Sequence, residues 1–172
     1  MRPIYLDACA IIDAIEKSTA EGQALINLIA EGAGDNTPFI TSDLTLAEVL
    51  VEPIRGLIDR DPTNEDPASR FHHDWYAGNL TPDGLLIQTK AMDRDILMQA
   101  AIMRARVRSL KIPDAIHAAT AFRFNCTHFV TGDASLMRGI QRDPAWSASP
   151  RRFNFVPLKV EALDALRNEL VS

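Results

Sequence analysis

The chain has 172 residues, of which 47% are hydrophobic and 24% are charged, so its composition excludes a disordered, collagen-like or disulfide-stapled protein. This length suits one ordinary globular domain, and we expect a single domain over residues 1–172. The net charge of −5 argues against a nucleic-acid partner only if the charges are evenly spread, and they are not.

The N-terminal half alternates short apolar runs with longer segments of helical periodicity. In chain order, we expect a strand at 3–6, a helix at 8–17, a helix that begins after the N-cap Thr19 and ends at 32–34, a strand at 39–41, and a helix capped by Ser42 or Asp43 that Pro53 bends or ends. The polar residues 59–66 predict a surface loop.

The C-terminal half continues this alternation. We expect a short helix at 71–76, a strand at 85–87, helices at 92–107 and 112–124, strands at 128–131 and 153–156, and an amphipathic helix at 160–170. Short apolar strands separated by helices require a parallel sheet that is covered on both faces. The predicted fold is therefore α/β, a three-layer α/β/α sandwich with about five parallel strands, whose ligands bind beyond the carboxyl ends of the strands.

Several features bear on where the protein works. The N-terminal apolar stretch is interrupted by Asp7 and Asp13, so we expect no signal peptide. No apolar run approaches the ~20 residues that a membrane span needs, so we expect no membrane partner. Cys9 and Cys126 have no CxxC spacing and are expected to be reduced thiols, which indicates a cytoplasmic protein.

Four carboxylates stand in apolar surroundings, unlike the other acids of the chain. Asp7 and Asp133 directly follow predicted strands, and Glu48 and Asp114 interrupt apolar helices. Taken singly, Asp7 and Asp133 would be helix N-caps. Burying four carboxylates requires a cation or several hydrogen-bond donors, so together the four predict one convergent site.

The chemistry of that site follows from its ligands. Carboxylate oxygens without a Cys and His cluster suit Mg²⁺ or Mn²⁺ and suit zinc poorly. A cation held in this way activates water and neutralises the charge that develops on a phosphodiester, which is the task of a nuclease site.

Four segments occur in a specific order, namely YLDACAII, LTLAEVLV, LKIPDAIHAATA and FVTGD. In this order and spacing they resemble the PIN-domain family, whose small bacterial members include VapC-type toxins. The resemblance implies a Mg²⁺- or Mn²⁺-dependent ribonuclease that hydrolyses RNA, frequent homodimers and, for the toxins, the antitoxin protein of a type II toxin–antitoxin pair. It assigns the family's catalytic and metal-binding acids to Asp7, Glu48, Asp114 and Asp133, with Thr131 as the hydroxyl beside the last.

The sequence departs from the family at two positions. Ala8 and Cys9 stand where the family usually has Thr followed by Ser or Asn, and a thiol is a poor ligand for Mg²⁺. An alternative therefore stays open, a PIN-like module that binds RNA or a protein around a weakened metal site. As a catalytic nucleophile, Cys9 lacks a nearby base.

Other residues are candidates for supporting roles. His117 follows Asp114 by three residues on one helical face, so we expect it either to support the site from behind or to pack locally. Glu52, one turn after Glu48, either extends the acidic rim or is exposed. Adjacent His72 and His73 diverge on a helix and give little support for zinc.

The basic residues concentrate in segment 104–152, which has nine of them against three acidic residues. This segment predicts either contacts with RNA phosphates or a solvated face. The residues that we expect to bind RNA lie just before the helix of Asp114, and they are Arg104, Arg106, Arg108 and Lys111.

Overall fold

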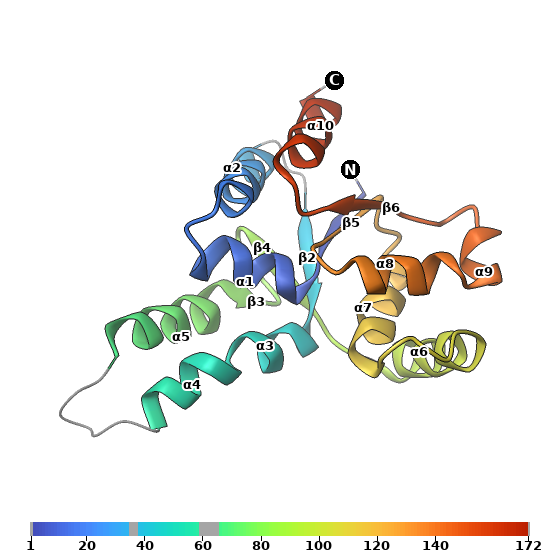
Figure 1. Cartoon of the computed structure of the whole chain (residues 1–172), viewed down its shortest axis with the longest axis horizontal. Helices are drawn as coiled ribbons and strands as arrows, with labels where there is room; N and C mark the ends of the chain where they lie inside the picture. Colours follow the sequence, from blue (N-terminus) through green and yellow to red (C-terminus); the bar gives the residue numbers. More distant parts are fainter. Residues whose placement is uncertain (1, 35–37, 59–65, 172) are drawn as a thin grey trace.

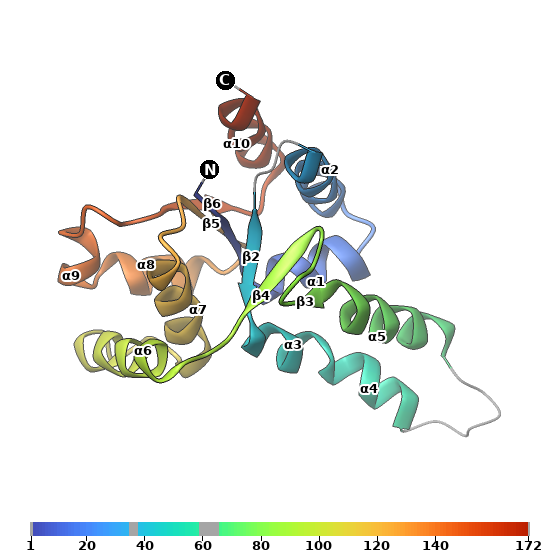
Figure 2. The ribbon, with the colours of Figure 1, turned by 180° about the vertical axis from the view of Figure 1, so that it is seen from behind.

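The computed structural model describes residues 2–34, 38–58 and 66–171 (Figures 1 and 2). Within these residues one parallel sheet has six strands in the order β3-β4-β2-β1-β5-β6. The strands are β1 (Ile4–Leu6), β2 (Phe39–Ser42), β3 (Leu80–Thr81), β4 (Ile87–Lys90), β5 (His128–Thr131) and β6 (Asn154–Pro157). The predicted α/β class is confirmed, with one strand more than the expected five, because the two-residue edge strand β3 is too short to leave a sequence pattern.

Helices cover both faces of the sheet (Figures 1 and 2). One hydrophobic core joins the sheet to α1 (Ala8–Glu16), α2 (Ala20–Gly34), α5 (Pro67–Asn79) and α10 (Val160–Val171). The other core joins the opposite face to α6 (Arg94–Arg106), α7 (Ile112–Arg123) and α8 (Ala134–Gln141). The remaining helices are α3 (Asp43–Val49), α4 (Val51–Ile58) and the short α9 (Pro144–Ser147).

The central strand β1 shows how the sheet separates the two cores. Its three residues are fully buried, with Ile4 and Leu6 in one core and Tyr5 in the other. This follows from the alternation of side chains along a strand. Tyr5 stacks on Phe129 of β5 with ring centroids 4.8 Å apart, so the second core is rich in aromatic contacts.

Two predicted helix boundaries have clear local causes. The hydroxyl of Thr19 accepts a hydrogen bond from the Gly22 amide at 3.0 Å and so caps α2. Pro53 lies in the first turn of α4, and the helical structure is interrupted between α3 and α4 at Leu50. Proline has no N–H for the carbonyl four residues before it and its ring clashes with that carbonyl, which explains the break.

Several predicted boundaries were wrong. The strand expected at 85–87 begins only at Ile87, because Leu85 is 95% exposed and belongs to the preceding turn. The helix expected at 71–76 is the longer α5, which begins at Pro67 after the cap residue Asp66. The helices α8 and α9 were not predicted. The loop expected at 59–66 lies outside the described residues except for Asp66.

Among the described residues, no helix is both long enough and apolar enough to cross a membrane.

Two glycines provide a matched test of the packing. A methyl group at Gly84 would overlap the carbonyl oxygen of Ile87, whereas one at Gly78 in α5 would meet no atom within 4 Å. We expect Gly84→Ala to lower the free energy of unfolding by about 1–3 kcal/mol, because the backbone that leads into β4 must shift. Gly78→Ala should raise it by up to about 1 kcal/mol through helix propensity. Urea unfolding of both variants measures these changes, and an unaltered Gly84→Ala protein would contradict the packing.

Candidate active site

The four acids predicted from the sequence lie around the carboxyl edge of the sheet. Asp7 follows β1 and caps α1, and Asp133 follows β5 and caps α8. Because β1 and β5 pair in parallel, with Leu6 opposite Val130, these two carboxylates leave the sheet side by side. Glu48 lies on α3, which continues directly from β2, the other neighbour of β1 (Figure 1).

Asp7 is held by donors from three sides. The Thr131 hydroxyl donates to Oδ2 at 2.7 Å, the Cys9 thiol donates to the same oxygen at 3.0 Å, and the Ala8 amide donates to Oδ1 at 3.0 Å. Only 5% of Asp7 is exposed, so these bonds replace the water that the carboxylate has lost. Its two oxygens therefore have fixed directions.

Cys9 supplies a hydrogen-bond donor at the position where the sequence departs from the family. Its sulfur also accepts a bond from the Gly132 amide at 3.3 Å, which ties α1 to the end of β5. Burial and the negative charge of Asp7 raise the pKa of the Cys9 thiol to about 12. At neutral pH the group is therefore a protonated donor to Asp7 and not a nucleophile.

Asp133 is fixed by its own helix. Its Oδ1 accepts bonds from the Ser135 amide at 2.7 Å, the Ser135 hydroxyl at 2.6 Å and the Leu136 amide at 3.1 Å. Burial raises the pKa of this carboxyl, but the bonds from Ser135 and Leu136 outweigh it and lower the pKa. The Asp133 amide donates to the Thr131 hydroxyl at 3.0 Å, so Thr131 bonds to Asp7 and Asp133 at once.

A buried chain of hydrogen bonds positions Glu48. His117 Nε2 lies 2.8 Å from Glu48 Oε2, and its Nδ1 lies 2.7 Å from the hydroxyl of Tyr5. Because a carboxylate only accepts, Nε2 carries the hydrogen of its bond. His117 is 2% exposed; burial lowers its pKa, but the bond to Glu48 and the charges of Asp7, Glu48 and Asp114 raise it on balance.

Asp114 lies in the first turn of α7. In this position the positive end of the helix dipole favours its negative charge. Burial, and then the negative charges of Asp133 and Asp7, raise the pKa of this carboxyl, while Lys111 partly offsets them. The structure thus brings Asp7, Asp114 and Asp133 within mutual electrostatic reach.

The chemistry of this donor set fits a hard divalent cation. The converging groups are carboxylates, and the negative charges of Asp133 and Asp7 add to burial in raising the pKa of Asp114. A bound cation would relieve this repulsion between the carboxylates. Among the described residues, no three His, Cys, Asp or Glu side chains form a ready coordination sphere as they lie. Binding a cation here would therefore require these acidic side chains to rearrange.

The four basic residues predicted to bind RNA have different environments. Arg104 Nε donates to the Leu110 carbonyl at 3.0 Å, and Arg106 lies 3.6 Å from the buried carboxylate of Asp143. These two arginines therefore have roles inside the fold. Lys111, at the start of α7, lowers the pKa of Asp133 and opposes the rise at Asp114, so its charge acts on the acidic cluster. Arg108 is exposed.

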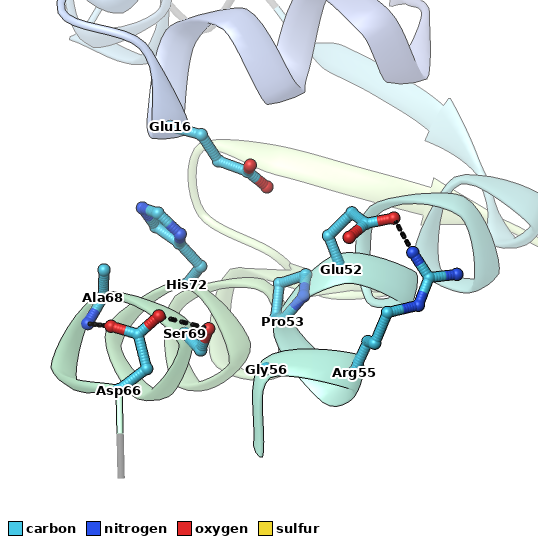
Figure 3. A pocket seen from close by; sticks show the side chains of 9 residues that line it. All are labelled: Glu16, Glu52, Pro53, Arg55, Gly56, Asp66, Ala68, Ser69 and His72. Atoms are coloured by element: carbon cyan, nitrogen blue, oxygen red, sulfur yellow. Dashed lines mark hydrogen bonds and ion pairs between the residues drawn. The ribbon is translucent and has the colours of Figure 1, made fainter. Parts of the chain in front are cut away.

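A polar cavity of about 430 Å³ lies apart from the four acids, between the end of α1, α4 and the start of α5 (Figure 3). Glu52 lines it and pairs with Arg55, so Glu52 belongs to this cavity and not to the acidic cluster. His72 also lines it, while His73 Nδ1 contacts Asp74 at 2.9 Å.

Two residues of the site were missed at the sequence level. Tyr5 anchors His117, and the available signal was that a tyrosine in a buried strand needs a partner for its hydroxyl. Ser135 fixes Asp133, and the signal was a serine two residues after a cap aspartate.

Comparison with known proteins assigns the family. A model of the PIN domain matches residues 4–140, so the chain belongs to the PIN domain family. Comparison with curated protein sequences gives no match. Among solved structures, the chain is similar to one from VapBC2 of Rickettsia felis bound to a DNA fragment from its promoter, with a TM-score of 0.61 and 13% identity over 88% of this chain and 96% of that one. It is also similar to a chain of a toxin–antitoxin complex from Klebsiella pneumoniae, with a TM-score of 0.53 and 18% identity over 91% and 98%. At these identities the likeness shows the fold.

The contact between Arg106 and Asp143 predicts that Arg106 contributes more to the free energy of unfolding than its neighbour Arg108. Arg106→Ala leaves the carboxylate of Asp143, only 1% exposed, without its cation, and should lower the free energy of unfolding by about 1–3 kcal/mol. Arg108→Ala, at an exposed position, should change it by less than about 0.5 kcal/mol. Chemical denaturation of both variants tests this, and equal stabilities would show that the contact is unimportant.

Proposed function

We propose that this PIN domain is a metal-dependent ribonuclease that hydrolyses phosphodiester bonds of RNA with Mg²⁺ or Mn²⁺. The observation that carries the proposal is the convergence of Asp7, Asp114 and Asp133 at the carboxyl edge of the sheet, where their charges act on one another. Such an edge is where α/β folds place their reactive groups. Glu48 is linked to them through His117, whose Nε2 lies 2.8 Å from Glu48 Oε2 and 3.8 Å from Asp7 Oδ1.

Each group has a distinct task in this proposal. A cation bound here would polarise the phosphoryl oxygen and lower the pKa of a water molecule. Asp7, Asp114 and Asp133 would hold it, and Thr131 keeps Asp7 and Asp133 in register. Glu48, fixed by His117, would accept a proton from the attacking water. Lys111 and Arg108 would contact the RNA backbone.

The partners follow from the family and from the similar structures. We infer that the protein is the VapC-type toxin of a type II toxin–antitoxin pair, because the similar structures described above include VapBC2 and a toxin–antitoxin complex. An antitoxin protein is then its partner, and a homodimer in the cytoplasm is its expected form. The exposed side chains of Leu97, Met98 and Ile102 on α6 are of the type that protein partners bury.

A second candidate function, a binding module with little catalysis, has its support in Ala8 and Cys9. Cys9 is a weaker hydrogen-bond donor to Asp7 than a serine would be. Metal-dependent cleavage distinguishes the two functions, since a binding module would retain RNA without cutting it.

We expect purified protein to cleave a mixed RNA pool with Mn²⁺ and to stop when EDTA is added. Asp114→Asn should reduce cleavage at least about 100-fold, because it removes one charge that holds the cation. Asp164→Asn, at an exposed position on α10, is the matched control and should cleave as the wild type does. Cleavage that persists in EDTA or in Asp114→Asn contradicts the proposal, and RNA binding without cleavage selects the binding module.

A further inference from the structure

A second cavity, of about 450 Å³, lies between α6, α7 and the chain that follows α9. Figures 1 and 2 both show α6 and α7 side by side, with α9 next to α8 on the same side of the sheet. None of the four acids lines this cavity. The side chains that matter for its chemistry are Asp95, Gln99, Phe122, Arg123 and Arg151.

Two of these side chains are arginines that come from different parts of the chain. Arg123 ends α7, and Arg151 lies between α9 and β6. In the described part of the chain, neither guanidinium forms an ion pair or hydrogen bond, in contrast to Arg104 and Arg106. Both belong to the basic segment 104–152 and are available to an anion such as a phosphate.

Phe122 offers the cavity a fixed aromatic ring. It is half-buried and packs edge-on against Phe153, with ring centroids 6.1 Å apart and an interplanar angle of 76°. Because this contact holds the ring, a planar base can stack on it at little entropic cost.

Asp95 and Gln99 line the same cavity from α6, one helical turn apart. A carboxylate accepts hydrogen bonds only, and a carboxamide both donates and accepts. This pair suits the edge of a base that bears an amino group, as adenine, cytosine and guanine do. Uracil has no amino group and can donate only its N3–H, so it makes fewer hydrogen bonds to this pair.

We propose that this cavity binds a ribonucleotide with an amino-bearing base, which stacks on Phe122, meets Asp95 and Gln99 at its edge, and places its phosphate between Arg123 and Arg151. This proposal rests on the proposed nuclease function: the bound nucleotide is one that flanks the scissile bond in the RNA. Helix α7 links the two sites, since Asp114 is in its first turn and Arg123 in its last, about 13 Å along the helix axis. A few nucleotides of a single strand span that distance.

The test uses mononucleotides, so that it does not depend on cleavage. The amide resonances of ¹⁵N-labelled protein in EDTA are followed during titration with AMP, CMP, GMP, UMP and inorganic phosphate. We expect saturable shifts at 95–99 and 119–123 with AMP, CMP or GMP, and clearly weaker binding of UMP and phosphate. Arg123→Gln/Arg151→Gln should weaken binding at least about ten-fold. Arg94→Gln/Arg142→Gln makes the same charge change at exposed positions outside the cavity and should have no effect.

Each alternative result overturns the proposal. If phosphate binds as tightly as the nucleotides, the cavity is an anion site only. If UMP binds as tightly as the other nucleotides, Asp95 and Gln99 do not recognise the base. If both double variants weaken binding equally, the attraction is non-specific.

A cleavage assay separates this proposal from the nuclease function. With short RNA, Arg123→Gln/Arg151→Gln should raise KM and leave kcat nearly unchanged. In a binding assay, the slope of the logarithm of the binding constant against the logarithm of the salt concentration should become shallower by about 0.7 per lost phosphate contact. If the wild type binds AMP, CMP or GMP here but cleaves no RNA, the nuclease function fails and the nucleotide site stands. If RNA is cleaved and the double variant has an unchanged KM, the cavity is not on the RNA path.

Discussion

The crowding of negative charge at the carboxyl edge of the sheet is the constraint on which the site depends. Parallel pairing of β1 and β5 brings Asp7 and Asp133 together, and Thr131 bonds to both of them. Asp114 joins them from α7, where burial, and then the negative charges of Asp133 and Asp7, raise its pKa. The surrounding donors from Cys9, Ser135 and the helix amides stabilise this arrangement, together with the positive charge of Lys111.

The sheet also divides the molecule into two cores, and the site uses both. Asp7 follows a strand whose middle residue, Tyr5, turns into the second core and anchors His117. His117 then reaches Glu48 on a helix that begins at the end of β2. The position of Glu48 thus depends on aromatic packing on the far side of the sheet from α1.

Much of this arrangement was predictable, because strands, caps and buried acids leave local patterns. The motifs around Asp7, Asp114 and Asp133 predicted both the fold and the cluster of acids. Contacts between distant residues leave no such pattern, which is why the bond between Tyr5 and His117 and the pairing of Arg106 with Asp143 were not foreseen. An apolar residue outside the strands also misleads a prediction from sequence, because hydrophobicity alone does not reveal exposure. Leu85 was predicted in a strand for this reason, and it is exposed.

Thermal unfolding with and without Mn²⁺ tests most directly whether the acids form a shared cation site. A ligand that binds only the folded state stabilises it. At Mn²⁺ concentrations about 100-fold above Kd, the free energy of unfolding should rise by about 2.7 kcal/mol, and the unfolding midpoint should therefore rise by several degrees. The rise should be lost in Asp114→Asn and kept in Asp164→Asn. An unchanged midpoint at every Mn²⁺ concentration, or the same rise in Asp114→Asn, would contradict a cation site built on these carboxylates.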